Sequence, residues 1–228
     1  MSAARADGRL DKIVANVEDA VADVKDGATI MVGGFGDVGV PFALIDALLA
    51  QGARDLTIVS NNAGSGDTGV AKLLKRERVR KIICSFPKTA GSTVFEELYR
   101  AGRIELELTP QGTLAERMRA AGAGIGAFFT PTGAGTLLAA GKETRMLEGR
   151  EQVLEYPIHA DVALIRADRA DRWGNLVYRK TARNFGPVMA SAAKTTIVEV
   201  REIVALGALD PEAIITPGVF VQRVVETG

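Results

Sequence analysis

The residues of this chain that could do chemistry begin with a glycine-rich loop. After Asp26, the apolar run Ala28 to Val32 reads as a strand, and Pro41 marks the start of a helix. Such a strand-to-helix turn exposes backbone N–H groups and brings a helix N-terminus close, and both attract a phosphate or pyrophosphate. We therefore expect a phosphate-bearing ligand to bind at the residues between strand and helix, which are Gly33, Gly34, Phe35, Gly36, Asp37, Val38 and Gly39.

The same loop also matches the dinucleotide fingerprint Gly-x-Gly-x-x-Gly, from Gly34 to Gly39. That fingerprint requires an acidic residue about 20 positions further on, at the end of the next strand, to bind a ribose hydroxyl. Here the next strand ends in Val59-Ser60-Asn61-Asn62, so that amides replace the carboxylate. A nicotinamide or flavin site is therefore disfavoured, whereas a glycine turn that only packs strand against helix remains open.

The first half of the chain alternates short β-branched runs with helical patterns, which is typical of a parallel sheet built from βαβ units. Thr93 with Glu96 forms a candidate capping box, and Thr113 with Glu116 repeats it. Ile104 to Leu108 alternates apolar and acidic residues, which indicates an edge strand with Glu105 and Glu107 as surface charges. The expected strand and helix pairs are Ala28 to Val32 with Phe42 to Leu49, Leu56 to Val59 with Val70 to Lys75, and Ile82 to Phe86 with Val94 to Arg100.

The second half is richer in strands. Gly122 to Gly141 reads as an ordered glycine-rich connection, and a β-rich stretch follows it. We expect an α/β fold in one domain, residues 1–228: an open, mostly parallel sheet flanked by helices, with a β-rich C-terminal part. The expected later elements are a hairpin of Thr144 to Glu148 with Gln152 to Tyr156, strands Val162 to Ile165 and Leu176 to Tyr178, a helix Pro187 to Ala193 and a strand Thr195 to Val200.

Composition excludes several classes of function. The 28 basic and 28 acidic residues balance, so no global field would gather nucleic acid or a membrane surface. A single histidine, His159, and a single cysteine, Cys84, disfavour a metal site and an internal disulfide. We expect Cys84 to be a small buried hydrophobe rather than a nucleophile. With no signal-peptide core and no apolar run long enough for a membrane span, a cytoplasmic location is expected.

The stretch from Asp26 to Pro41 resembles the CoA-binding signature in the first of the two subunits of class I, or 3-oxoacid, CoA-transferases. Cys84 to Pro87, Glu97 to Arg100 and Asp171 to Leu176 look most like the 3-oxoadipate (β-ketoadipate) branch of this family rather than the acetoacetate branch. Further stretches similar to the family, in order along the chain, are Ser60-Asn61-Asn62-Ala63-Gly64, Pro110 to Arg117, Thr130-Pro131-Thr132-Gly133, Ala182-Arg183-Asn184-Phe185 and Ile215-Thr216-Pro217-Gly218.

This resemblance implies a transferase that moves CoA from succinyl-CoA to a 3-oxo acid, most similar to the 3-oxoadipate enzymes. Family members react through a glutamate in a Ser-Glu-Asn-Gly motif, which does not occur between Met1 and Gly228. A separate second subunit should carry that glutamate, with the active site between the two chains. CoA would be a substrate, with no permanently bound cofactor. Acetoacetate or another short acid as acceptor, and a non-catalytic nucleotide-binding module, remain as alternatives.

Two amides match family positions near the reacting thioester. The resemblance implies that Asn61 donates to the thioester oxygen and that Gln111 orients the carboxylate end of the acyl group, because amide donors in a dry cleft stabilise developing charge. The alternative for each is a turn side chain bonded to nearby backbone. Arg183 and Asn184 are candidates for the subunit interface or the acyl carboxylate. The basic run of residues 75–81 is expected to serve a helix terminus and solubility rather than CoA phosphates.

Overall fold

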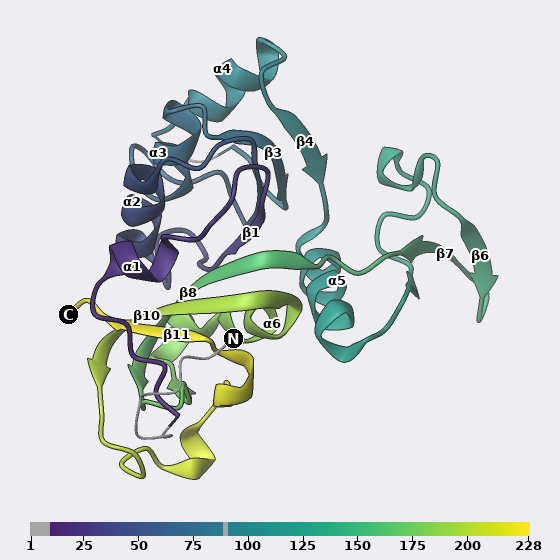
Figure 1. Cartoon of the computed structure of the whole chain (residues 1–228). Coiled ribbons are helices and arrows are strands. Elements are labelled where there is room, and N and C mark those ends of the chain that lie inside the picture. Colours follow the sequence, from purple (N-terminus) through teal and green to yellow (C-terminus); the bar gives the residue numbers. More distant parts are fainter. Residues whose placement is uncertain (1–9, 89–90) are drawn as a thin grey trace.

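The computed structural model describes residues 10–88 and 91–228, and within them one large sheet carries most of the chain (Figure 1). The strands are β1 (Thr29–Val32), β2 (Leu56–Val59), β3 (Val79–Cys84), β4 (Glu105–Leu108), β5 (Phe128–Thr130), β6 (Thr144–Leu147), β7 (Arg150–Glu155), β8 (Ala160–Ala170), β9 (Leu176–Val177), β10 (Ala193–Ile203) and β11 (Arg223–Glu226). In the large sheet the strand order is β11-β10-β8-β1-β2-β3-β4, with every neighbouring pair parallel. The short β9 pairs antiparallel with the end of β8.

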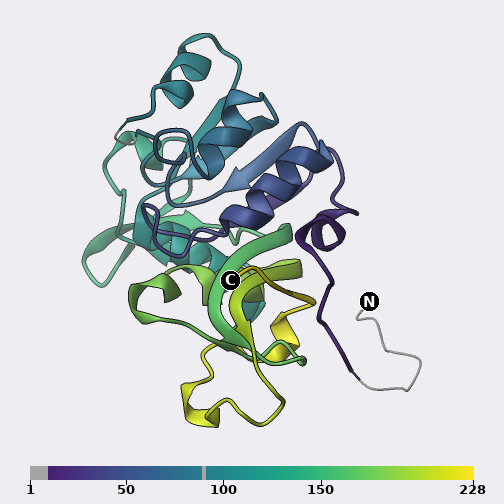
Figure 2. The ribbon, with the colours of Figure 1, turned by 90° about the vertical axis from the view of Figure 1, so that its left-hand side faces the viewer.

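Helices cover both faces of this sheet. Figure 1 shows α1 to α4 on one side and α5 and α6 on the other, and Figure 2 looks onto the α1 to α4 side. Successive side chains of a strand point to opposite faces of the sheet, so each strand contributes to the core under both layers of helices. In β1, Ile30 and Val32 enter the core under α2, whereas Met31 enters the core under α5 and α6. The helices are α1 (Val17–Val21), α2 (Phe42–Gln51), α3 (Val70–Lys75), α4 (Val94–Arg100), α5 (Gln111–Ala123) and α6 (Gly186–Ala192).

Much of the expected element pattern is confirmed. Helices α3 and α4 have the predicted bounds, and β4 lies at the edge of the large sheet. The predicted hairpin is present as β6 and β7, which pair antiparallel. The extended and helical segments of the second half become β8, β9, β10 and α6, so the mostly parallel α/β fold is as predicted.

Both predicted capping boxes are wrong. At the start of α4, the Thr93 hydroxyl donates to Glu97 Oε1 at 2.7 Å instead of capping the helix backbone. The second box fails because α5 begins two residues before Thr113, directly after Pro110. Thr113 is therefore inside the helix, where its hydroxyl is buried and no described residue forms a hydrogen bond with it. Pro110 fixes a backbone angle suited to a helix entry, and this outweighs the cap signal three residues later.

The glycine-rich connection of residues 122–141 contains a strand, β5, that the sequence did not indicate. It pairs with β7, and with β6 the three strands form a small antiparallel sheet that projects from the body in Figure 1. Glu107 is not a simple surface charge, because it bridges Lys81 at 2.6 Å and Arg117 at 2.8 Å. Arg117 also donates to the Tyr156 carbonyl at 2.8 Å, so this charged group ties the projecting sheet to the body.

A buried carboxylate holds the start of α2. Glu199 of β10 is 1% exposed, and its Oε2 accepts from the backbone N–H of Leu44 at 3.0 Å. Burial raises the pKa of the Glu199 carboxyl, and the Leu44 N–H and the Arg166 guanidinium oppose this in part. The first turn of a helix leaves N–H groups without internal partners, and the partial positive charge there suits a carboxylate. Glu199 thus occupies the helix terminus that we expected to face a phosphate.

Among the described residues, no helix is long and apolar enough to cross a membrane.

Replacing Glu199 with alanine tests this contact. Glu199→Ala leaves the Leu44 N–H buried without an acceptor, so we expect the free energy of unfolding to fall by about 1–3 kcal/mol, measured by urea denaturation. Glu202→Ala on the same strand is the control. Glu202 is half-exposed and paired with Arg201, so its loss should cost no more than about 0.5 kcal/mol. Equal losses in the two variants would contradict a capping role for Glu199.

Candidate active site at the carboxyl edge of the sheet

Four loops meet at one edge of the large sheet. Strands β1 to β4 lie side by side, and because they are parallel all four carboxyl ends point the same way. The loop after β1 carries the glycines, and the loop after β2 carries Asn61. Ser85 follows β3, and Gln111 begins the helix after β4. Open parallel sheets bind ligands at this edge, so the candidate residues stand where such a site is expected.

Asn61 and Gln111, 50 positions apart, are in direct contact. Asn61 is 6% exposed, and its side-chain oxygen Oδ1 accepts from Gln111 Nε2 at 2.9 Å. The same oxygen accepts from the Ser85 hydroxyl at 2.8 Å. The structure therefore brings the two predicted amides together and adds a third residue, Ser85. Neither amide is confined to a bond with nearby backbone, as the alternative interpretation required.

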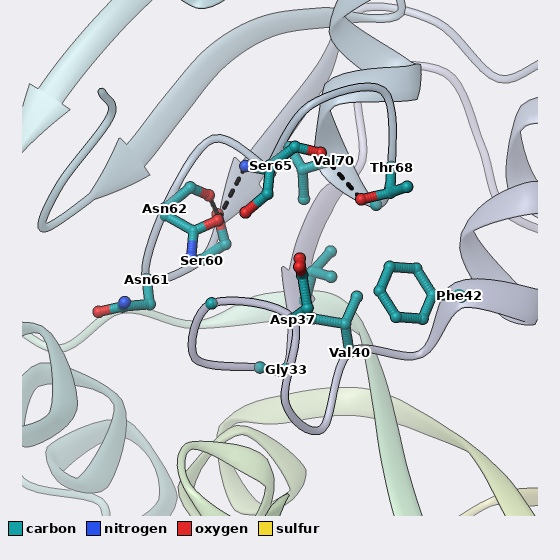
Figure 3. A pocket seen from close by; sticks show the side chains of 15 residues that line it. Gly33, Asp37, Val40, Phe42, Ser60, Asn61, Asn62, Ser65, Thr68 and Val70 are labelled. Carbon is teal, nitrogen blue, oxygen red and sulfur yellow. Dashed lines mark hydrogen bonds between the residues drawn. The ribbon is translucent and has the colours of Figure 1, made fainter. Parts of the chain in front are cut away.

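The amide nitrogen of Asn61 is left as a donor. Both side-chain neighbours donate to Oδ1, and within the described part of the chain no group accepts from Nδ2. Asn62, Ser65 and Thr68 line a small crevice beside the glycine loop. Figure 3 shows the Asn61 side chain pointing away from these three residues. An amide N–H aimed away from its own loop can donate to an oxygen that becomes negative during a reaction.

The glycine loop folds as a tight hairpin. Phe35 and Val38 exchange backbone hydrogen bonds of 3.0 and 3.1 Å, with Gly36 at the tip. Gly34 has a φ of +125°, and a Cβ there would lie 2.4 Å from Val40 Cγ2. Gly39 has a φ of +76°, and its Cβ would lie 2.5 Å from the Ala182 carbonyl oxygen. At these two positions only glycine fits without strain.

Asn184 clamps this hairpin. Its Oδ1 accepts from the Gly34 N–H at 3.2 Å, and its Nδ2 donates to the carbonyls of Val38 and Thr181, both at 3.0 Å. Both amide hydrogens are thereby used, and none remains for an acyl carboxylate. We therefore assign Asn184 to the loop rather than to the acyl carboxylate, while its candidacy for the subunit interface stays a prediction.

The space around the loop limits how a ligand approaches. The crevice between the glycine loop and residues 60–70, shown in Figure 3, has a volume of about 20 Å³, which holds little more than one water. An open hollow of about 610 Å³ lies on the outer side of the hairpin, lined by Phe35, Val38, Lys180, Thr181, Arg183 and Asn184. Because this hollow is open and lined by apolar and cationic side chains, it suits a large anionic ligand better than the crevice does.

Other candidate residues have structural roles. Cys84 is fully buried, as predicted, and burial raises the pKa of its thiol to about 12, so it is not a thiolate at neutral pH. The basic run of residues 75–81 is largely engaged. Lys75 pairs with Asp67, Arg80 with Glu105 at 3.0 Å, and Arg78 donates to the Gly52 carbonyl at 3.0 Å. The expectation that these side chains do not serve a CoA phosphate agrees with this pairing.

Comparison with known proteins decides the family. Residues 14–227 match the coenzyme A transferase family. This chain belongs to that family. The first subunit of a 3-oxoadipate CoA-transferase from Pseudomonas putida is 65% identical over 95% of this chain and 94% of its own length. The first subunit of a succinyl-CoA:3-ketoacid coenzyme A transferase from Helicobacter pylori is 49% identical over 94% of this chain and 92% of its own.

The same fold occurs in solved structures of CoA-transferases. An acyl-CoA transferase from Escherichia coli O157:H7, solved as a thioester complex with CoA, superposes with a TM-score of 0.85 at 24% identity. The match covers 100% of this chain and 49% of that one, so this chain spans about half of that enzyme. At this identity the likeness shows the fold, and the CoA-transferase fold is thus present in the described residues.

Ser85 and Glu199 are the residues of this edge that sequence reasoning missed. The sequence places Ser85 inside a predicted strand, Ile82 to Phe86, and Ser85 stands out only as part of a stretch that resembles the family. In the structure β3 is Val79–Cys84, so Ser85 is the first residue after the strand, as a correct strand boundary would have shown. Glu199 lies in the middle of β10, and nothing in its local sequence points to α2.

The two glycines of the hairpin give a stability test. We expect Gly34→Ala to lower the free energy of unfolding by about 2 kcal/mol or more, since the new Cβ meets Val40 and the backbone angle is unfavourable. Gly36→Ala is the matched control, because it has a φ of +56° but open space for a Cβ, and about 1 kcal/mol is expected. Urea denaturation measures both. A Gly34 variant as stable as the Gly36 variant would show that the close approach to Val40 is unimportant.

Proposed function

We propose that this chain is the first subunit of a transferase that moves CoA from succinyl-CoA to a 3-oxo acid, preferably 3-oxoadipate. The observation that carries the proposal is the hydrogen-bonded pair of Asn61 and Gln111 at the carboxyl edge of the sheet, with Asn61 Nδ2 free to donate. No carboxylate is hydrogen-bonded to either amide among the described residues. Because the Ser-Glu-Asn-Gly motif does not occur in residues 1–228, we take the reacting carboxylate to come from the second subunit.

The reaction divides between two chains. A glutamate carboxylate of the second subunit attacks the carbonyl carbon of succinyl-CoA, the C–S bond breaks, and an acyl-glutamyl anhydride and the CoA thiolate result. The thiolate then attacks the glutamyl carbonyl, which gives a glutamyl-CoA thioester and frees succinate. The acceptor carboxylate reverses these two steps. Each attack places negative charge on a carbonyl oxygen, and Asn61 Nδ2 donates to that oxygen.

Gln111 holds the acyl group in place for this chemistry. Its Nε2 carries two hydrogens, of which one is donated to Asn61 Oδ1. The second hydrogen is free to bind the carboxylate end of the acyl group. The hydrogen bond from Gln111 to Asn61 thus joins the side chain that orients the substrate to the side chain that stabilises charge. It keeps the two side chains at a constant separation.

CoA binds as a substrate at the glycine loop, and no permanently bound cofactor takes part. The N–H groups of Gly36, Asp37 and Gly39 have no acceptor within the described residues, whereas those of Gly34, Phe35 and Val38 are used within the fold. The outer hollow with Lys180 and Arg183 offers positive charge to phosphates. Because Glu199 occupies the start of α2, the loop and these side chains, rather than the helix terminus, bind the anion.

The chain acts as one domain in the cytoplasm under this proposal. Strands of the large sheet come from both halves of the sequence, with β1 between β2 and β8, which favours a single folding unit over residues 1–228. The buried single cysteine suits a reducing compartment. Acetoacetate remains the alternative acceptor, because the 49% identical relative from H. pylori is named for 3-ketoacids; the 65% identity to the 3-oxoadipate enzyme favours 3-oxoadipate.

Reconstitution with a second subunit that carries the reactive glutamate tests the proposal. We expect the chain alone to transfer no CoA, and the two-chain complex to convert succinyl-CoA with 3-oxoadipate at higher kcat/KM than with acetoacetate. A glutamyl-CoA thioester should be trapped on the second subunit, where mass spectrometry detects it. Transfer by the chain alone would contradict the division of the reaction between two chains, and no gain on forming the complex would favour a non-catalytic module. A reversed preference would favour acetoacetate as the acceptor.

A bulky residue at the hairpin tip tests the role of the glycine loop. In the complex, Gly36→Phe should raise the KM for succinyl-CoA and also lower kcat by about tenfold, because binding energy from the distant end of CoA is used at the reacting end. Gly36→Ala shares the backbone strain without the bulk and should change kcat by less than about twofold. A Gly36→Phe effect on KM alone would show that the loop contributes affinity but not rate.

A further inference from the structure

We propose that Ser85 is a positioning residue for the transfer reaction, and that its hydroxyl sets which end of the Asn61 amide faces the thioester. The inference rests on the proposed function of Asn61. Ser85 directly follows β3, the neighbour of β2 in the large sheet, and its hydroxyl lies between the two strand ends. It would not contact the substrate. Its effect on the reaction passes through Asn61.

A side-chain amide can adopt either of two orientations, because its oxygen and NH₂ ends have nearly the same shape. With Nδ2 toward the thioester, Asn61 donates to the developing charge; with Oδ1 there, it would repel that charge. Gln111 alone does not decide between these, since its own amide can turn to offer either a donor or an acceptor. A neighbour that is better satisfied by donating to Asn61 than by accepting from it is needed.

The hydrogen bonds around Ser85 make it that group. The Ser85 hydroxyl lies 2.8 Å from Asn61 Oδ1 and 3.0 Å from the Asn61 backbone oxygen. That backbone oxygen already accepts the N–H groups of Ser85 at 3.2 Å and Phe86 at 3.1 Å. A carbonyl oxygen has two lone pairs, and both are occupied. With Oδ1 toward Ser85, the hydroxyl hydrogen has an acceptor there. With the amide turned, the hydroxyl would accept from Nδ2, and its own hydrogen would have to compete for the occupied backbone oxygen. The first arrangement is favoured, so Oδ1 is the acceptor and Nδ2 is the outward donor.

The backbone around Ser85 is held firmly enough for this role. Pairing between β2 and β3 continues past the strand ends, through a hydrogen bond from Ser60 N to the Ile83 carbonyl at 3.1 Å and a parallel bridge between Asn62 and Phe86. Ser85 and Asn61 thus face each other across one continuous ladder. A donor group that is oriented before substrate binds lowers the barrier without reorganisation during the reaction.

The test uses the two-chain complex and compares Ser85→Ala, Ser85→Thr, Asn61→Ala and the double variant. Ser85→Ala should lower kcat by about tenfold, the effect of one lost hydrogen bond, with KM for both substrates changed less than about twofold. Ser85→Thr keeps the hydroxyl and should recover most of the rate. In an Asn61→Ala background, Ser85→Ala should have no further effect, because the residue that it orients is gone.

Ser191→Ala is the control, because Ser191 lies in α6, away from this edge, and its hydroxyl donates to the Val188 carbonyl at 3.0 Å. Its kcat should match that of the unaltered complex. The proposal is overturned if Ser85→Ala keeps full kcat, or if it lowers kcat equally with and without Asn61. If Asn61→Ala loses about 10²–10³ in kcat while Ser85→Ala loses none, only the role of Ser85 fails. An Asn61→Ala complex with full activity would instead remove the proposed function of Asn61 and, with it, this inference.

Discussion

The parallel pairing of β1, β2, β3 and β4 in chain order is the constraint on which the site depends. Since each strand is followed by a return helix or loop, every carboxyl end in this group opens at the same edge. Gly33, Asn61, Ser85 and Gln111 each follow a different strand, yet they lie close together because adjacent strands are about 5 Å apart. An antiparallel sheet would have sent alternate loops to opposite ends, and the amides could not have met.

Most polar groups at this edge serve the fold itself. Asn184 saturates its amide on the glycine hairpin, Glu199 takes the start of α2, and Ser85 with Gln111 occupies the oxygen of Asn61. Buried polar groups without partners are costly, so such mutual satisfaction is the rule in a stable interior. Among the described residues of this edge, the donors that remain for a ligand include Asn61 Nδ2, the second hydrogen of Gln111 Nε2 and N–H groups of the hairpin.

Under the proposed function the site is one side of a reaction centre. This chain contributes amide donors and positive charge, whereas the nucleophilic carboxylate belongs to the partner. The division keeps a reactive carboxylate away from the loops that bind the anionic carrier, and it makes activity depend on assembly. Placing the charge-stabilising donor on a residue that is held by two neighbouring loops favours a site that is ordered before the partner docks.

The sequence alone predicts the alternation of strands and helices, the glycine-rich loop and the amides after the strands, because these follow from local periodicity and turn chemistry. It also indicates the family, through motifs spread along the chain. The hairpin form of the loop and the role of each polar group follow from the tertiary structure. Asn61 bonds to Ser85 across 24 positions, Gly34 to Asn184 across 150, and Leu44 to Glu199 across 155. No local pattern encodes such pairs, since they exist only once strand order and register bring distant residues to the same edge.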